Sequence, residues 1–214
     1  MPERGRNAKR LIGSIYSAAA ERLYDRVVVN GAFKLFGGSL NNLVRIQGRR
    51  AMELAGGQPI LDMPVGTAYF AADVARSYPG LVVGVDIAEG MVRQARVVAR
   101  RAGARLEVVQ ADAHHLPFPD ESFAAILCSN GLQVIPDLRA SIAELARVLA
   151  PGGTLLISVV TLPAPVPYAA RRRLPTMMRP GSDVAAELRA AGLDARITTR
   201  ERLATLIEAT CPLD

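Results

Sequence analysis

The sequence predicts an α/β protein in which helices cover both faces of a mostly parallel, doubly wound sheet. From residue 59 onward, short apolar segments alternate with helical patterns, and this alternation is typical of parallel strands joined by crossover helices. With 214 residues the chain has the size of one domain and is long enough to bury a core. We expect an N-terminal helical cap over residues 1–58 and a single structural unit over residues 59–214 that binds the ligand.

Seven segments carry strand patterns. Five are short, rich in β-branched residues and bounded by turn residues, which is how buried strands usually read. They cover residues 59–65, 81–87, 106–113, 124–130 and 154–160. Segments 195–203 and 204–211 follow each other almost without a gap, so they predict an antiparallel hairpin at the end of the sheet.

Helical patterns lie between and around these strands. Apolar residues recur at three- to four-residue steps, and the predicted helices cover residues 11–29, 40–54, 67–78, 91–101 and 138–149. The turn "PGGT" from Pro151 ends the last of these and leads into the fifth strand. Residues 161–181 contain five prolines and predict an irregular excursion, and a helix capped by Ser182 and ending at Gly192 follows it.

Composition argues against several functional classes. The net charge is +6, but only two of the 26 basic residues are lysines, and the cluster Arg171, Arg172 and Arg173 has only Tyr168 beside it for stacking. We therefore expect no nucleic-acid partner. No apolar run reaches the roughly 20 residues of a membrane-spanning helix, and no secretory signal pattern is present, so we expect a cytoplasmic protein.

Metal and redox chemistry find little support. The two cysteines match no metal-ligand or redox spacing, and no cluster of acidic or amide residues with ligand spacing follows the fourth strand. We expect no metal. The oligomeric state is open, and a homodimer is one of the alternatives.

The ligand of an open α/β sheet binds at the carboxyl ends of its strands, which gives four short segments to consider. These are residues 62–68, 86–87, 112–113 and 129–132. Asp86 ends the second strand twenty residues after Gly66, where a carboxylate can accept both hydroxyls of a ribose. The structural alternative is that Asp86 only caps the helix that begins near Ala88.

The loop "MPVGTAYFA" selects between two cofactors that share this geometry. A dinucleotide loop uses several glycines to bring backbone N–H groups close to a pyrophosphate, whereas only Gly66 is present here. S-adenosylmethionine has no phosphate, and its ammonium group needs a carboxylate such as Asp62 nearby. The loop favours the sulfonium cofactor, and a nicotinamide-dependent oxidoreductase is the less favoured alternative.

Four blocks of the sequence resemble a known family. They read "ILDMPVGTA", "VVGVDIAEGMVRQAR", "ADAHHLPFPDESFAAILCSNGLQVIPD" and "ELARVLAPGGTLLIS", and they cover roughly residues 59–160. This pattern is similar to the class I S-adenosylmethionine-dependent methyltransferases, in the branch of the ubiquinone/menaquinone C-methyltransferases. The resemblance implies a Rossmann-like seven-stranded sheet of order 3-2-1-4-5-7-6, with S-adenosylmethionine as cofactor and S-adenosylhomocysteine as product.

The resemblance also implies roles for individual residues. Asp62 and Gly66 would hold the methionine portion of the cofactor, with Thr67 capping the loop. Asp86 would bind the ribose hydroxyls, and Ile87 would lie against the adenine.

Four further residues complete the cofactor site that the resemblance implies. Asp112 would accept a hydrogen bond from the adenine amino group, beside the backbone of Ala113. Ser129 would line the pocket near the sulfonium. Tyr24 matches an aromatic residue that closes over the cofactor in this branch.

The sequence departs from the family at three places. Pro64 and Ala68 replace loop glycines, which stiffens the turn. Gln133 stands where relatives often carry a histidine and is unable to act as a general base. The catalytic residue is therefore unassigned, and His114 and His115 are weak candidates because they are the only histidines.

The residues left for the acceptor are mostly apolar. The N-terminal helices, residues 129–133 and the side chains of Leu174, Met177 and Met178 favour a small lipophilic molecule, phenolic, quinol-like or of polyketide or terpenoid type. The leading hypothesis is methyl transfer to an oxygen, carbon or nitrogen atom of such an acceptor. The alternative is a methyltransferase fold that binds the cofactor without methyl transfer, as a rearrangement catalyst or a partner-binding subunit.

Overall fold

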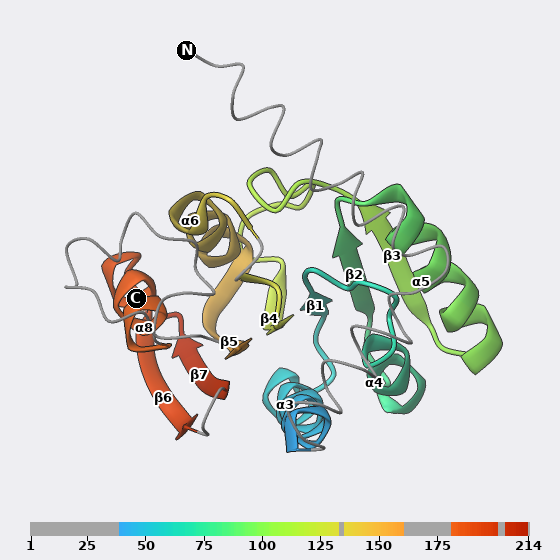
Figure 1. Cartoon of the computed structure of the whole chain (residues 1–214), viewed down its shortest axis with the longest axis horizontal. Helices are drawn as coiled ribbons and strands as arrows, with labels where there is room; N and C mark the ends of the chain where they lie inside the picture. The colour runs from blue at the N-terminus through green and yellow to red at the C-terminus, as the bar shows by residue number, and fades with distance from the viewer. Residues whose placement is uncertain (1–38, 133–134, 161–180, 201–203, 214) are drawn as a thin grey trace, which may run out of the picture.

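The computed structural model describes residues 39–132, 135–160, 181–200 and 204–213, and its centre is a seven-stranded sheet (Figure 1). The strand order is β3-β2-β1-β4-β5-β7-β6, as expected. All neighbours pair in parallel except β7, which runs antiparallel to both β5 and β6. The strands are β1 (Ile60–Asp62), β2 (Val82–Asp86), β3 (Leu106–Gln110), β4 (Phe123–Ser129), β5 (Leu149–Val160), β6 (Asp194–Arg200) and β7 (Ala204–Thr210).

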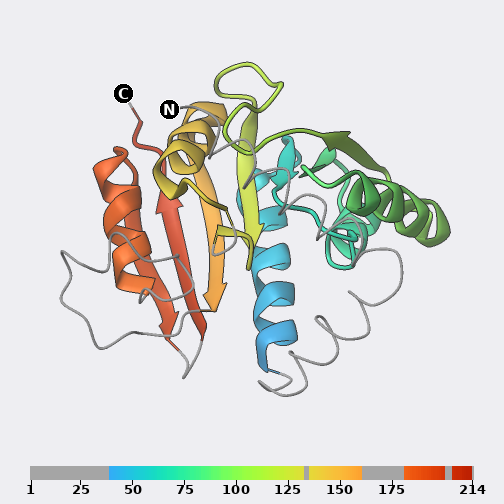
Figure 2. The ribbon, with the colours of Figure 1, turned by 45° about the horizontal axis from the view of Figure 1, so that its top comes forward.

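Helices cover both faces of this sheet (Figure 2). Alternate strand residues point to opposite faces, and the larger core cluster joins one face to α6 and α8, while the other clusters join the opposite face to α3, α4 and α5. The sheet is therefore buried on both sides, as parallel sheets are. The helices are α3 (Ser39–Ala55), α4 (Ala71–Ser77), α5 (Glu89–Ala102), α6 (Leu138–Val148) and α8 (Gly181–Ala190).

Several predicted boundaries were wrong. The helix expected from residue 67 begins at Ala71, because the preceding residues form the loop after β1. The strand expected to begin at residue 154 begins at Leu149, directly after α6 and with the "PGG" turn inside it. Ser182 is not a cap, because α8 already begins at Gly181.

The N-terminal part of the chain is described only from Ser39. The helix predicted over residues 40–54 is confirmed as α3, which packs against β1, β4 and β5. The helix predicted over residues 11–29 and the proline-rich excursion lie outside the described residues, and the division into a cap and a ligand-binding unit stays a prediction. Among the helices that the structure describes, none is long and apolar enough to cross a membrane.

Candidate active site

Three acidic residues and one serine meet at the carboxyl edge of the parallel strands. Asp62, Asp86 and Ser129 are the last residues of β1, β2 and β4, and Asp112 lies two residues after β3. Because these strands are parallel neighbours, their carboxyl ends lie along one edge of the sheet. The residues predicted for the site are thus brought together, apart from Tyr24 and Gln133, which lie outside the described residues.

The loop after β1 is tight despite its single glycine. Gly66 has a φ of +54°, and Ala68 adopts a φ of +61°, a left-handed conformation that costs an alanine about 1 kcal/mol relative to glycine. Pro64 fits because Gly131 lies against its ring, where a Cβ on Gly131 would come within 2.0 Å of the proline Cδ. The two replacements that distinguish this loop are therefore accommodated by its surroundings.

Asp86 connects this loop to the start of α5. Its Oδ2 accepts a hydrogen bond from the backbone N–H of Gly66 at 3.0 Å, and its Oδ1 accepts one from the N–H of Ala88 at 2.9 Å. The side chain is buried, and burial raises its pKa while these N–H donors lower it. Ala88 is the N-cap residue of α5 and the helix has no side-chain cap, so Asp86 binds the N–H of the residue before the helix and does not cap it.

Asp62 is the buried carboxyl group of the site. It is 6% exposed, and its Oδ1 has no hydrogen-bond partner. Burial, together with the nearby charge of Asp86, raises its pKa from 3.8 to about 7. A buried carboxyl group with an unpaired oxygen favours binding of a cation, because the cation pairs with that oxygen and stabilises the ionised form of the carboxyl group.

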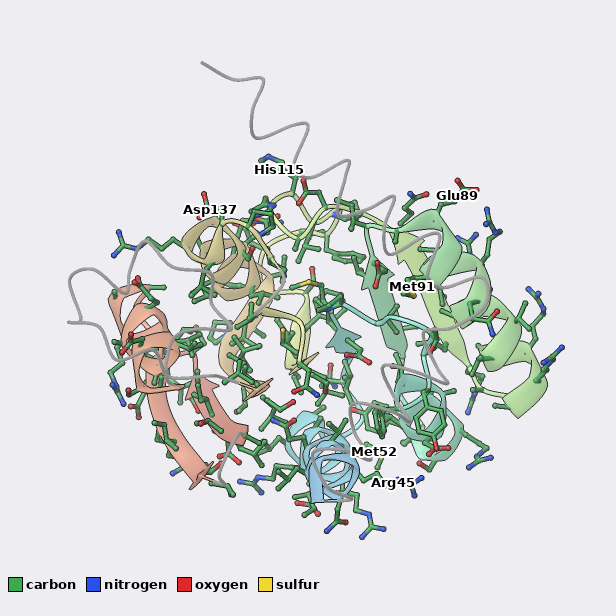
Figure 3. All side chains as sticks on the ribbon, in the orientation of Figure 1. Arg45, Met52, Glu89, Met91, His115 and Asp137 are labelled. Carbon is green, nitrogen blue, oxygen red and sulfur yellow. The ribbon has the colours of Figure 1, made fainter. Side chains whose placement is uncertain are left out.

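A pocket of about 140 Å³ opens beside Asp62, between α3 and α4. Its walls are mixed, since half of the lining residues are polar or charged: Asp62 and Ser129 lie at the sheet, Arg45 and Arg49 on α3, and Asp73 and Ser77 on α4. The sticks in Figure 3 place Arg45 and Met52 on the helix that borders it. The lining residues are Val44, Arg45, Gly48, Arg49, Met52, Asp62, Phe70, Asp73, Val74, Ser77, Leu127 and Ser129.

The two histidines differ in their surroundings. The ring of His114 is buried and lies between Asp112, with Nδ1 and Oδ1 2.5 Å apart, and the carbonyl oxygen of Asp137, 3.2 Å from Nε2. Both ring nitrogens are thus engaged by protein groups, which gives no support to a general base at this position. His115 is exposed, and its side chain points outward at the edge of the molecule (Figure 3).

Arg147 on α6 holds residues 116–120, the segment that follows Asp112, and the sequence did not reveal this role. Its guanidinium donates to the carbonyl oxygens of Leu116 and Phe118 and to the carboxylates of Asp120 and Glu144. These acidic partners raise the pKa of the arginine. The arginine of the block "ELARVLAPGG" was the available signal, since it stands in one of the two most specific blocks of the sequence.

The other predicted cofactor-binding residues, Thr67, Ala113 and Ile87, also lie at the carboxyl edge of the parallel strands. Thr67 is buried beside Gly66, and Ala113 is half-buried beside Asp112. Ile87 is 40% exposed, which leaves an apolar surface next to Asp86. Within the described ranges, no three His, Cys, Asp or Glu side chains gather as they would around a metal ion.

Comparison with known proteins identifies the domain. Residues 60–153 match the family model described as a methyltransferase domain. A demethylmenaquinone methyltransferase from Clavibacter sepedonicus is 41% identical over 132 residues, which cover 61% of this chain and 52% of that protein. The ubiquinone/menaquinone biosynthesis C-methyltransferase of Escherichia coli is 40% identical over 105 residues, which cover 47% of this chain and 42% of that protein. The chain thus spans about half the length of the curated relatives it matches.

Solved structures show the same fold. The [4+2]-cyclase SpnF superposes with a TM-score of 0.69 at 22% identity, over 80% of each chain. A SAM-dependent methyltransferase from Aquifex aeolicus superposes with a TM-score of 0.67 at 20% identity, over 83% of this chain and 95% of the other. Residues 60–153 thus match a methyltransferase-domain model, and the described chain shares its fold with solved structures that include a SAM-dependent methyltransferase.

Proposed function

We propose that this protein is an S-adenosylmethionine-dependent methyltransferase that transfers a methyl group to an oxygen, carbon or nitrogen atom of a small lipophilic acceptor. The observation that carries the proposal is Asp62, a buried carboxyl group beside a pocket, whose Oδ1 has no hydrogen-bond partner among the described residues, in a segment that matches a methyltransferase-domain model. Such a group destabilises the protein unless a cation pairs with it. The ammonium group of the cofactor is a cation of suitable size and charge.

The other residues at the strand ends fit the rest of this cofactor. Each oxygen of Asp86 accepts a hydrogen bond from a backbone N–H, and a carboxylate has further lone pairs for the vicinal hydroxyls of a ribose. The exposed face of Ile87 suits an adenine ring, and Asp112 is placed by His114 on the same side. The single glycine of the loop argues against a pyrophosphate, because such a group needs close approach to several backbone N–H groups.

The cofactor would supply an electrophilic methyl group on a positively charged sulfur, and the protein has to align the acceptor and exclude water. Alignment alone lowers a barrier by about 7 to 11 kcal/mol when the reacting atoms are held in line. Transfer disperses the positive charge of the sulfur, so apolar walls such as Met52, Phe70 and Leu127 favour it. A dedicated general base is therefore not required for this chemistry.

A ring-shaped, quinol-like acceptor is the substrate class that the relatives support. Two of them are by name methyltransferases acting on demethylmenaquinone or in ubiquinone and menaquinone biosynthesis. The apolar part of the pocket lining, which includes Met52, Phe70 and Leu127, agrees with a lipophilic ring. The acceptor atom is left open by these observations, because oxygen, carbon and nitrogen nucleophiles fit equally.

Calorimetric titration with S-adenosylmethionine, S-adenosylhomocysteine and NADPH tests the cofactor. We expect both sulfur compounds to bind and NADPH not to bind, and Asp86→Asn to weaken S-adenosylhomocysteine binding at least 10-fold while the protein stays folded. Binding of NADPH alone would refute the proposal. Incubation with methyl-labelled cofactor and a panel of phenols and quinols tests turnover, and cofactor binding without any labelled product would favour the alternative without methyl transfer.

A further inference from the structure

Two buried polar side chains on the sheet face under α3 have no hydrogen-bond partner among the described residues. Gln47 is 3% exposed, and neither Nε2 nor Oε1 of its amide is bonded. Ser158 on β5 is 0% exposed, and its Oγ is likewise without a partner. Buried polar groups are nearly always paired, since an unpaired one loses its hydration without compensation. Two such residues on the face of the sheet under α3 point to a ligand that pairs with them.

The packing of α3 places Gln47 over the middle of the sheet. Leu43, Gln47 and Ala51 follow one another at four-residue steps, so they form one stripe of the helix. Leu43 belongs to a core cluster with Leu206 on β7, whereas Ala51 belongs to a cluster with Leu156 on β5. Gln47, between them, therefore faces the region where β5 and β7 adjoin.

The strand register brings Ser158 to the same place and connects it to the pocket. Ser158 pairs with Leu206 on β7 and with Ser129 on β4. Side chains alternate along a strand, so Ser129 and Ser158 share the face of Leu127 and Leu156, which α3 covers. Ser129 lines the pocket described above. The side chains of Gln47 and Ser158 lie under α3 on the β5 side of that pocket, beyond the residues that line it.

We propose that Gln47 and Ser158 form a subsite that binds a neutral hydroxyl or carbonyl group of the acceptor, whose apolar body occupies the pocket between α3 and α4. The amide offers donors and an acceptor, and the hydroxyl offers one of each, so together they match a neutral oxygen group. Neither carries a charge that would select an ion. This inference rests on the proposed function, because it assigns the acceptor side of the same site.

The test compares apolar replacements with a matched control. Gln47→Met and Ser158→Ala remove the unpaired groups with little change of shape. Ser141→Ala is the control, because Ser141 is equally buried but its Oγ donates to the carbonyl oxygen of Asp137. Each variant is measured for thermal stability, for affinity to S-adenosylhomocysteine, and for affinity to 1-naphthol and naphthalene in the presence of S-adenosylhomocysteine.

We expect the wild-type protein to bind 1-naphthol at least 10-fold more tightly than naphthalene. Gln47→Met and Ser158→Ala should each reduce this preference several-fold, with unchanged or higher Tm and S-adenosylhomocysteine affinity within about threefold of wild type. Ser141→Ala should lower Tm and leave the preference intact. Equal binding of the two probes to the wild type, or an intact preference in both variants, would overturn the subsite.

The outcome for the subsite is separable from that for methyl transfer. If the wild type binds no S-adenosylhomocysteine but still prefers 1-naphthol in a way that depends on Gln47, the proposed function fails and the subsite stands. If S-adenosylhomocysteine binds normally and neither replacement changes the preference, the cofactor assignment stands and the subsite fails.

Discussion

Asp62→Asn should make the free protein more stable at neutral and alkaline pH. The substitution keeps the shape of the side chain and removes a buried charge that has an unpaired oxygen. The pKa of Asp62 rises from 3.8 to about 7 on folding. At about 1.4 kcal/mol per pH unit, this difference corresponds to a destabilisation of up to about 4 kcal/mol when the group is ionised.

The sign of the pH dependence follows from which state holds the proton. Between pH 4 and pH 7 the folded protein keeps the proton on Asp62 while the unfolded chain has lost it, so wild-type stability falls as the pH rises through this window. The amide that replaces the carboxyl group does not titrate. The free energy of unfolding of Asp62→Asn, relative to that of the wild type, should therefore increase by about 2–3 kcal/mol between pH 5 and pH 8 and stay constant above pH 8.

Urea unfolding of both proteins at pH 5, 6, 7 and 8, without cofactor, measures this difference. The unpaired amide of the variant is buried at every pH, so its cost cancels in the comparison between pH values. Asp73→Asn is a suitable control, because Asp73 also lines the pocket but its side chain is 47% exposed. A stability difference that does not change with pH, or one that shrinks toward pH 8, would refute the assigned ionisation.

Asp62→Asn should also weaken the binding of the cofactor, although it stabilises the free protein. Asp62 binds an ammonium group only when it is ionised, so the wild-type affinity for S-adenosylhomocysteine should fall as the pH drops below about 7. In Asp62→Asn this dependence should be lost and the affinity at pH 8 reduced at least 10-fold. Unchanged affinity at pH 8 would remove Asp62 from the cofactor site.

Three further predictions test how the loops are held. Gly131→Ala should destabilise the protein by about 2–3 kcal/mol in urea unfolding, because the new methyl group meets the neighbouring proline ring, and a fully stable variant would contradict that packing. Gly66→Ala should destabilise the protein by about 1 kcal/mol, because Gly66 has a positive φ and its Cβ position is open. Ala68→Gly should change the stability by less than about 1 kcal/mol, because glycine relieves the left-handed conformation while some burial is lost. Equal destabilisation by the two substitutions would count against this account. If Asp112 contacts the cofactor as proposed, Arg147→Met should weaken S-adenosylhomocysteine binding about 10-fold, because it releases residues 116–120, which follow Asp112. Asp120→Asn, which changes only the 75% exposed partner, should have little effect in the same titration.

Local sequence patterns were sufficient for the order and type of the described elements. Period-two and helical patterns depend on which residues are apolar, so the strands and α3 were predicted within a few residues. Boundaries were less accurate where loops intervene. The helix after β1 begins four residues later than its pattern suggested, and Ser182 lies within α8, because hydrogen bonds to distant segments decide where a helix starts.

The composition of the candidate site was also readable from the sequence. Asp62, Asp86 and Asp112 end or follow apolar strands, and parallel topology sends such ends to one edge. The single glycine of "ILDMPVGTA" argues against a pyrophosphate independently of the tertiary structure. The sequence does not determine whether each of these side chains is buried, charged or hydrogen-bonded.

The burial and the hydrogen bonds of these side chains depend largely on neighbours that are far away in the chain, so they are seen only in the tertiary structure. Asp62 and Asp86 are both acidic residues at strand ends, yet one has an unpaired oxygen and the other joins two backbone N–H groups. His114 is engaged at Nδ1 by Asp112, two residues away, and at Nε2 by the carbonyl oxygen of Asp137, which no local pattern reveals. Gln47 reads as one more polar residue of an amphipathic helix, and only the packing of α3 on the sheet buries it without a partner. Local pattern predicted the helices and strands, and the resemblance to a known family predicted the strand order that the structure has. Burial and hydrogen bonding, which set the charge of each group, exist only once distant segments are packed together.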